Sequence, residues 1–201
     1  MEFKLRLATP DDVEALCETF FSGFVENLIA IHAFPSTSSD VQEFWRRGMV
    51  SDIEDSDMCL VVVDDISTSP PTLIALAKWR FVPAGADLSP PTNEWPEGGD
   101  HELATTFFFE GWRMHKGIMG GRPHWYLELL STRKEYQRKG VGSILMEWGV
   151  EKADADGWEC YLGSSAEGKG LYEKYGFMEV ERRTHFQGKF QQVFMRRDSR
   201  E

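Results

Sequence analysis

Two runs of sequence decide the fold: Trp125-Tyr126-Leu127-Glu128-Leu129-Leu130-Ser131 and Gln137-Arg138-Lys139-Gly140-Val141-Gly142. The first run is mostly apolar and has the composition of a strand, and a short polar link joins it to the second. A helix follows from Gly140 to Ala155, because apolar residues recur there at the spacing of one helical face. The pattern predicts a strand, a tight loop and a helix in immediate succession.

The loop between this strand and this helix has the chemistry of a phosphate site. Its two glycines, Gly140 and Gly142, let the backbone approach a ligand closely. The first amides of the helix have no partners inside the helix, and the positive end of the helix dipole lies behind them. Arg138 and Lys139 add charge at the same place. A tight turn whose glycines only permit the geometry is the alternative, and the strand–loop–helix context favours a phosphate.

Two other kinds of nucleotide site fit the sequence less well. The dinucleotide fingerprint needs a third glycine, and Leu145 stands at that position. Residues 163–170 almost spell a P-loop, but Gly170 stands where a Ser or Thr should bind magnesium. Gly176 also breaks the following helix within two turns. We therefore reject both interpretations.

Strands and helices alternate in the rest of the chain. We expect strands at 3–8, 59–63, 73–82, 158–162, 177–184 and 190–195, helices through 13–21, 41–49 and 101–119, and a short helix that ends at Gly176. Residues 82–100 carry four prolines and several glycines. We expect a surface insertion without regular structure there, and its role stays open.

The composition narrows the classes of function. Twenty-two basic against thirty-three acidic residues give a net charge of −11, which argues against a nucleic-acid partner. No apolar run approaches the roughly 20 residues of a membrane span, and the first residues lack the apolar stretch of a secretory signal, so we expect a cytoplasmic protein without a membrane partner. Cys17, Cys59 and Cys160 have no metal-binding spacing, so we expect reduced, mostly buried thiols and no metal.

Residues 125–178 resemble the core of the GNAT superfamily of N-acetyltransferases. The cofactor signature of that family is Gln or Arg, two residues, Gly, one residue, then Gly or Ala, and Gln137, Gly140 and Gly142 fill it. Residues 171–177, Leu-Tyr-Glu-Lys-Tyr-Gly-Phe, are similar to a second family motif, and the opening of the chain resembles the first strand and helix of the family. Segments 34–57 and 82–119, on the acceptor side, match no specific pattern.

The resemblance implies a fold, a cofactor and a set of binding residues. The fold is one α/β domain over residues 1–201, with a mixed, largely antiparallel sheet flanked by helices. The cofactor is acetyl-CoA, used as a co-substrate without a metal, with its pyrophosphate on the loop Gln137, Arg138, Lys139, Gly140, Val141, Gly142 and Ser143. The strand before the loop splays from its neighbour, and its free amides at Leu129, Leu130 and Thr132 bind the pantetheine arm and the thioester oxygen. Ser165 stands where the family often has an Asn that contacts the pantetheine.

The resemblance also favours Tyr172 as the general acid, because the family tyrosine at this position faces the sulfur; a packed aromatic is the alternative. Tyr175, on the following turn, is interpreted as structural. Glu128 is the candidate base, because a carboxylate in an apolar strand is costly unless it is paired or useful. Alternation places it on one face with Tyr126 and Leu130, and a salt bridge or strand-end exposure is the alternative. His115, His124 and Glu110 are weaker candidates for the base.

The predicted function is transfer of the acetyl group of acetyl-CoA to a primary amine of a small molecule, by direct attack in a ternary complex. A protein or peptide N-acetyltransferase is one alternative, and a non-catalytic acyl-CoA-binding sensor is another. The excess of acidic over basic residues in the chain allows a cationic acceptor. The identity of the acceptor, the acyl-chain preference and the choice between monomer and homodimer stay open at the level of sequence.

Overall fold

The computed structural model describes residues 1–201 with the exception of 87, 92, 93 and 201. Its centre is a seven-stranded sheet in the order β1-β2-β3-β4-β5-β7-β6. β4 and β5 run parallel, and the other neighbouring strands run antiparallel. The strands are β1 (Phe3–Leu7), β2 (Met58–Asp65), β3 (Thr72–Val82), β4 (His124–Thr132), β5 (Glu159–Ser165), β6 (Met178–His185) and β7 (Phe190–Arg197).

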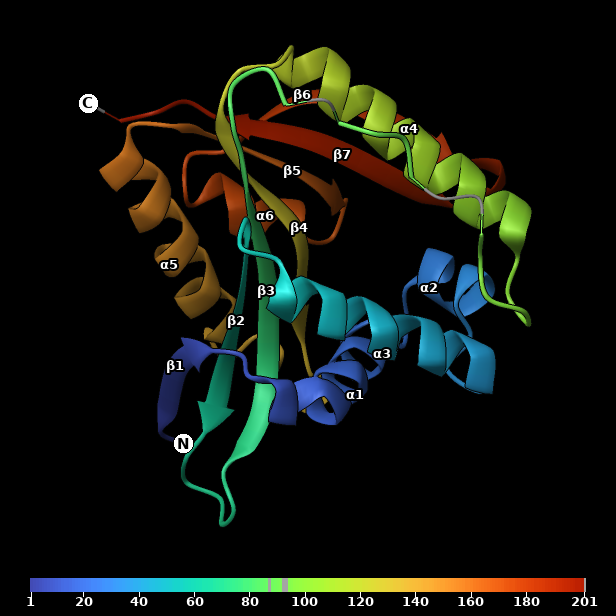
Figure 1. Ribbon diagram of the computed structural model, residues 1–201, viewed down its shortest axis with the longest axis vertical. Coiled ribbons are helices and arrows are strands. Elements are labelled where there is room, and N and C mark those ends of the chain that lie inside the picture. The colour runs from blue at the N-terminus through green and yellow to red at the C-terminus, as the bar shows by residue number, and fades with distance from the viewer. Residues whose placement is uncertain (87, 92–93, 201) are drawn as a thin grey trace.

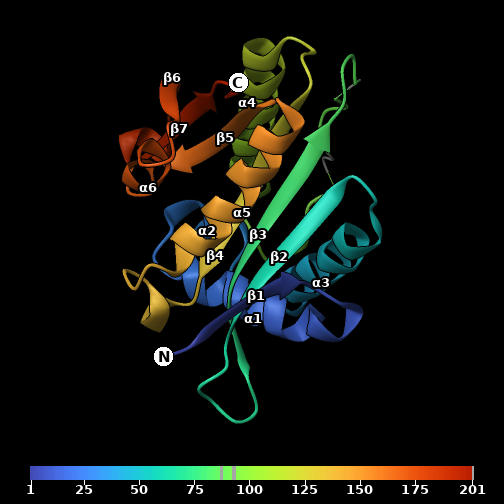
Figure 2. The ribbon, with the colours of Figure 1, turned by 90° about the vertical axis from the view of Figure 1, so that its left-hand side faces the viewer.

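Helices cover both faces of this sheet, as Figures 1 and 2 show. α5 and the short α6 lie on one face, and the other four helices lie on the opposite face, with α4 over the strands that are last in sequence. The helices are α1 (Val13–Gly23), α2 (Leu28–Ala33), α3 (Ser39–Glu54), α4 (His101–Met119), α5 (Val141–Asp156) and α6 (Lys169–Glu173). The predicted fold class, a mixed and largely antiparallel sheet flanked by helices, is confirmed.

The contact between α5 and the sheet is unusually close. Gly149 of α5 faces Trp79 of β3, and a Cβ at that glycine would lie 2.0 Å from the indole ring. The indole Nε1 donates a hydrogen bond to the Leu145 carbonyl, at 3.3 Å. Because the interior is close-packed, this contact fixes the height of α5 above the sheet and with it the position of the helix N-terminus.

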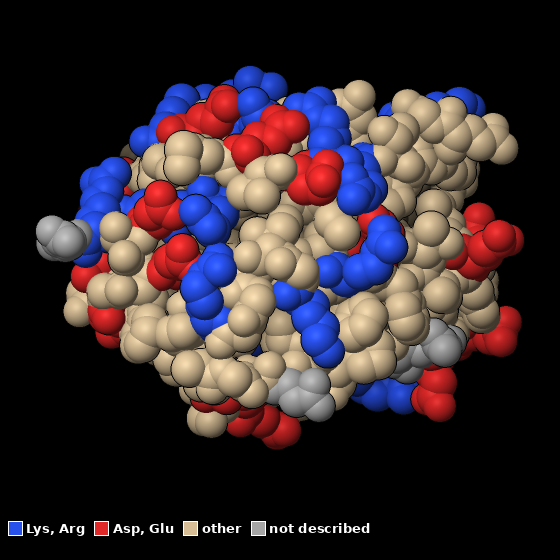
Figure 3. Space-filling model, turned by 90° about the horizontal axis from the view of Figure 1, so that it is seen from above, with Lys and Arg blue, Asp and Glu red and all other residues tan. Residues whose placement is uncertain are grey.

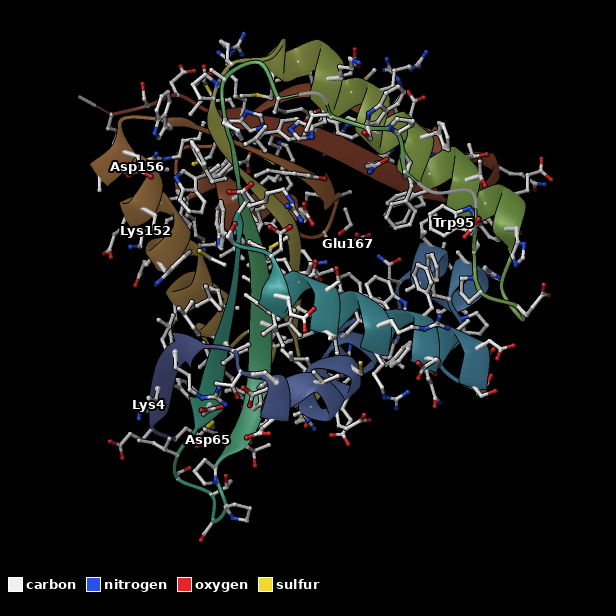
Figure 4. The ribbon with its side chains drawn as sticks, in the orientation of Figure 1. Lys4, Asp65, Trp95, Lys152, Asp156 and Glu167 are labelled. Atoms are coloured by element: carbon white, nitrogen blue, oxygen red, sulfur yellow. The ribbon has the colours of Figure 1, made fainter. Side chains whose placement is uncertain are left out.

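Residues 83–100, in their described part, contain no helix or strand, as predicted. The segment is nevertheless anchored, because Asp100 donates its amide to the His32 carbonyl of α2 at 2.9 Å. Trp95 lies between the start of α4 and the helices below it (Figure 4), where its Nε1 donates to Thr105 and its ring packs edge-on against Phe34. The insertion therefore joins α4 to α2 and α3.

Two helices differ from the sequence prediction. α2 was not predicted, because it has only six residues; it begins at the cap Asn27, whose side chain accepts from the Ala30 amide. α3 extends beyond the predicted 41–49 at both ends, and Ser38 caps its start. α2 is too short for a helical period to be recognised, and the added turns of α3 are mostly polar.

Candidate functional site

The loop before α5 has an unusual backbone at two positions. Arg138 has φ 61° and Gly140 has φ 83°, so both lie in the left-handed region that favours glycine. Gln137 holds the loop in place, because its side-chain amide donates to the Gly23 carbonyl at 3.2 Å and to the Thr132 carbonyl at 3.1 Å. The predicted loop is thus clamped between the end of α1 and the end of β4, and it turns its backbone sharply into the helix.

The first turn of α5 lies directly behind this loop. The Ser143 amide donates to the Gly140 carbonyl at 3.0 Å, while the amides that begin a helix have no partner within it. Gly142 packs closely, since a Cβ there would lie 3.2 Å from Leu171 and 3.7 Å from Leu130. Arg138 and Lys139 are exposed beside the same helix end. An anion of phosphate size is favoured at such a helix N-terminus.

The strands β4 and β5 diverge beside this loop. Their parallel pairing runs from His124 opposite Glu159 to Leu127 opposite Leu162 and does not continue beyond that pair. Leu129, Leu130 and Thr132 still pair with β3 on their other side. Some backbone groups of this stretch therefore point into the gap between β4 and β5, toward the N-terminus of α5.

A bulge interrupts β4 at the point of divergence. Lys78 of β3 pairs with Leu129 while Trp79 pairs with Leu127, so Glu128 is the extra residue on β4. The predicted alternation is therefore wrong for Leu130. Tyr126 and Glu128 share the face of α4, but Leu130 packs into the core beneath α5, because the bulge shifts the alternation by one residue.

Glu128 lies in a network of charged side chains. Arg80 Nε donates to its Oε1 at 2.6 Å, and Lys78 Nζ lies 3.8 Å from its Oε2. Arg80 also contacts Asp55 at 2.7 Å, and Lys78 contacts Asp52 at 2.5 Å. Three carboxylates thus face two cations, which leaves one formal negative charge in the cluster. Lys78 and Arg80 were missed in the sequence, although charges at alternate positions of an apolar strand are a signal for a polar site on one face.

Tyr172 and Tyr175 have different surroundings on and after α6. Tyr172 is buried in the core beneath α5, burial raises its pKa to about 12, and its hydroxyl has no hydrogen-bond partner in the part of the chain that the structure describes. Tyr175 is bound at both ends, because its hydroxyl donates to the Ser143 carbonyl at 3.1 Å and its own carbonyl accepts from Arg197. Tyr172 therefore has the free phenol, and Tyr175 ties α6 to the first turn of α5.

Ser165 ends β5 beside α6. Its hydroxyl oxygen accepts a hydrogen bond from the Gly168 amide at 3.3 Å, and its carbonyl accepts one from the Ser164 hydroxyl at 2.6 Å. The side chain is thus engaged in the turn that leads into α6.

The weaker candidates are engaged in contacts of their own. His115 and His124 are buried against each other, with their Nε2 atoms 2.6 Å apart. Burial opposes the charged form of Glu110, but hydrogen bonds from Arg113 and Arg183 outweigh it and lower the pKa of that carboxyl. Figure 3 shows Lys and Arg lying among Asp and Glu over the face that is seen from above. Arg183 of β6 pairs with Glu110 of α4, and Arg182 pairs with Glu179 within β6.

A cavity of about 330 Å³ lies at the carboxyl end of β5. Its walls come from three places: the connection between α1 and α2, the turn after β5, and the turn that leads into β7. Glu167 lies at the end of β5 and is directed into the space on the side of α2 (Figure 4). The lining residues are Glu26, Asn27, Leu28, Ala166, Glu167, Gly188, Lys189, Phe190 and Gln191.

Residues 107–179 match the sequence model of the acetyltransferase (GNAT) domain. The resemblance to the GNAT superfamily is thereby confirmed. The matched segment contains the loop before α5, the divergent strands and α6, and a GNAT acetyltransferase domain supports an acyltransferase activity. No curated protein matches the sequence.

Solved structures share the fold of the whole chain. An acetyltransferase from Corynebacterium glutamicum, described as histone acetyltransferase HPA2 and related, is 17% identical with a TM-score of 0.66 over 100% of this chain and 98% of that one. The PaiA N-acetyltransferase of Thermoplasma acidophilum, in complex with coenzyme A, is 16% identical with a TM-score of 0.62, covering 98% and 99%. A mosquito arylalkylamine N-acetyltransferase-like protein is 16% identical with a TM-score of 0.67, covering 98% and 99%.

Acetyl-CoA is the acyl donor of the GNAT family, and the residues present fit it. Arg138 and Gly140 give the loop a concave backbone, and Gly142 brings the helix end against Leu171 without a side chain in between. The pairing of β4 with β5 ends at Leu127, beside this helix end. Among the described residues no group of three or more His, Cys, Asp or Glu is arranged to hold a metal, and no described helix is long and apolar enough to cross a membrane.

Proposed function

We propose that the chain is one N-acetyltransferase domain, which moves the acetyl group of acetyl-CoA to a primary amine of a small molecule by direct attack in a ternary complex. One observation carries this proposal. The parallel pairing of β4 and β5 ends at Leu127 and Leu162, and the resulting gap lies beside the N-terminus of α5. A cofactor whose pyrophosphate lies on that helix end has its thioester in the gap, within reach of both faces of the sheet.

Bound acetyl-CoA supplies a thioester carbonyl and a thiolate leaving group. The loop residues Gln137 to Ser143 hold the pyrophosphate, chiefly through backbone amides. Leu129, Leu130 and Thr132 offer backbone groups to the pantetheine arm and the thioester oxygen, and Ser165 lines the other side of the gap. These contacts orient the carbonyl for attack and stabilise the charge that develops on its oxygen.

Two side chains move the protons. Glu128 takes the proton that the amine must lose, and the net negative charge of its cluster with Arg80, Lys78, Asp52 and Asp55 attracts a cationic acceptor. Tyr172 gives its phenolic proton to the departing thiolate, since a phenol whose pKa is raised to about 12 is protonated at neutral pH. The ammonium nitrogen loses two protons in all: Glu128 takes one before attack and passes it to solvent, and the second leaves as the N–C bond forms and the C–S bond breaks. This second proton balances the one that Tyr172 gives to the sulfur.

The cavity at the end of β5 supports a small acceptor. Its volume of about 330 Å³ falls in the range of small-molecule sites, which extends from about 300 to 1,000 Å³. α4 and the insertion before it cover the sheet on the same side, where a protein substrate would need a long open groove. Glu26, which is paired with Lys134, and Glu167 lie in the cavity wall together with Lys189, so the wall carries charges of both signs.

A thiol-release screen tests the proposal. The protein is incubated with acetyl-CoA and a panel of arylalkylamines, polyamines, amino acids, aminoglycosides and peptides, and free CoA is measured. We expect thiol release with one class of small primary amines. Release only with peptides would favour a peptide N-acetyltransferase. Binding of acetyl-CoA without release for any amine would favour a sensor.

A further inference from the structure

Gln192 of β7 is a buried polar residue on the face of α4. Only 6% of its surface is exposed, and its side chain extends across β5. Its amide nitrogen lies 3.5 Å from the positions that a Cβ would occupy at Gly163 of β5 and at Gly111 of α4. Two glycines therefore make room for this amide, one beneath it on the sheet and one above it on the helix.

His185 fixes the orientation of that amide. Its Nε2 lies 2.9 Å from Gln192 Oε1, and because a carbonyl oxygen only accepts, Nε2 carries the proton and donates it. His185 is itself buried and held by the rings of Phe107 and Phe190. The amide nitrogen of Gln192 has no hydrogen-bond partner among the residues that the structure describes, and it is not one of the buried polar atoms without a partner, so solvent reaches it. A fixed donor that the described protein groups leave unused and that solvent reaches is free to bond a ligand.

The amide lies at the point where β4 and β5 separate. Leu127 and Leu162 form the last pair, so Gly163 and Glu128 are the next residues on the two diverging strands. Gly163 is exposed, and the Gln192 amide and the Phe194 ring lie beside it on the face of α4. Glu128 and Gln192 both lie on this face, on the β4 side and the β7 side of the point where the strands separate. An acceptor that reaches the gap from this face passes between them.

We infer that Gln192, oriented by His185, donates a hydrogen bond to an oxygen atom of the acceptor, close to its reacting nitrogen. The acceptor class is then an amine that carries an ether, hydroxyl or carbonyl oxygen near the amino group, rather than a simple alkylamine. This inference rests on the proposed function and names the acceptor of that same site. Gln192 binds the acceptor, and His185 is a positioning residue that acts through it.

The test compares acceptors of matched shape. 2-Methoxyethylamine and n-butylamine have the same shape, but only the first carries an oxygen acceptor, and glycinamide against isobutylamine, which has two methyl groups in place of the amide oxygen and nitrogen, forms a second pair. kcat/KM is measured for each amine with the parent protein, Gln192→Met, His185→Phe and His185→Gln. Gln42→Met serves as the control, because Gln42 is exposed and its side chain bonds only the Ser36 carbonyl among the described residues.

The parent and the control should prefer the oxygen-containing amine of each pair by about tenfold or more, because a site built around a hydrogen-bond donor discriminates against an analogue that lacks the acceptor. Gln192→Met should abolish that preference while retaining turnover of the alkylamine. His185→Phe should weaken the preference, and His185→Gln, which keeps an N–H donor, should restore most of it.

Three outcomes overturn the inference while leaving acetyl transfer intact. These are a parent without the preference, a Gln192→Met variant that keeps it, and an equal loss for both amines of a pair. The last outcome would place the amide on the thioester instead of the acceptor. If no amine causes release of free CoA from acetyl-CoA, the proposed function is wrong, and this inference is wrong with it.

Discussion

Leu127 of β4 and Leu162 of β5 face each other as the last residues of the one parallel pairing in the described sheet. Both side chains are buried in the core beneath α5, so the strands are held together up to this pair. Beyond it the bulge at Glu128 turns β4 away, and β5 continues along β7. The proposed site depends on this divergence, because the strands separate beside the loop Gln137 to Gly142 that leads into α5.

Substitution of Gly142 by Glu should abolish acetyl-CoA binding. A Cβ at this position already meets Leu171 at 3.2 Å, and the carboxylate would lie where the pyrophosphate is expected. Acetyl-CoA should raise the melting temperature of the parent but not that of the variant. Gly117→Glu is the matched control, because Gly117 lies on α4 with open space around its Cβ. Unchanged affinity in a folded Gly142→Glu protein would show that the cofactor binds elsewhere.

Tyr172→Phe should lower turnover by about 100- to 10,000-fold, the usual contribution of a general acid. The change removes only the hydroxyl, which has no partner among the described residues, so packing and acetyl-CoA affinity should barely change. Tyr175→Phe is the control and should lose little, since its hydroxyl bonds the Ser143 carbonyl and Glu147. Turnover of both variants is measured at saturating acetyl-CoA. A Tyr172→Phe enzyme within about threefold of the parent would make the residue structural.

Glu128→Gln should flatten the acidic limb of the pH–rate profile. An amine that is cationic in solution must lose a proton before attack, so kcat/KM of the parent should rise with pH, and loss of the carboxylate that takes this proton should change the profile. Glu110→Gln is the control, because Arg113 and Arg183 already hold that carboxylate in an ion-paired state. If the Glu128→Gln profile overlays that of the parent, the carboxylate serves only the ion pair with Arg80.

The segments with a strong local pattern were predictable from sequence. The helix 101–119 was predicted with the bounds that the structure has, and the strand, loop and helix around Gly140 follow the predicted order. Residues close together in sequence determine these elements. The helix 101–119 begins after an Asp cap and carries a cluster of aromatic residues, and the helix after Gly140 follows a pair of glycines.

The contacts between distant segments were not predictable. The bulge at Glu128 depends on the pairing of β4 with β3, and it moved Leu130 to the opposite face. Arg80 was missed as the partner of Glu128, because 48 residues separate them in sequence. The sequence did not indicate that Gln192 and His185 belong to the site. A polar residue in a strand usually faces solvent, and only the packing of α4 buries these two.

The His115–His124 pair should make the stability depend on pH. The Arg122 carbonyl accepts a hydrogen bond from His124 Nδ1, which therefore carries the proton, so His124 Nε2 is free to accept a hydrogen bond from His115 Nε2. Burial lowers the pKa of His115 to about 3, while in the unfolded chain it lies near 6.5. The unfolded state therefore binds more protons between these values, so stability is full above about pH 6.5 and is lost as the pH falls toward 3.

At pH 5 this loss should amount to about 2 kcal/mol for His115 relative to pH 7.5. Chemical unfolding at several pH values measures it. His115→Gln keeps an N–H donor for His124 but cannot titrate, so its free energy of unfolding should fall less between pH 7.5 and pH 5. The exposed His101, replaced by Gln, is the control and should retain the slope of the parent. If the free energy of unfolding falls with pH equally in the parent and in His115→Gln, the histidine pair is not the cause of the pH dependence.

Mass balance with labelled acetyl-CoA tests the central claim most directly. The protein is incubated with acetyl-CoA that carries a labelled acetyl group, first alone and then with the best amine of the screen, and the amine, the free CoA and the intact protein are followed by mass spectrometry. Direct attack in a ternary complex predicts labelled acetyl amine and free CoA in equal amounts, and an intact protein mass that stays unchanged in the absence of amine. Free CoA without acetylated amine, or an acetyl group retained on the protein before amine is added, would contradict the account.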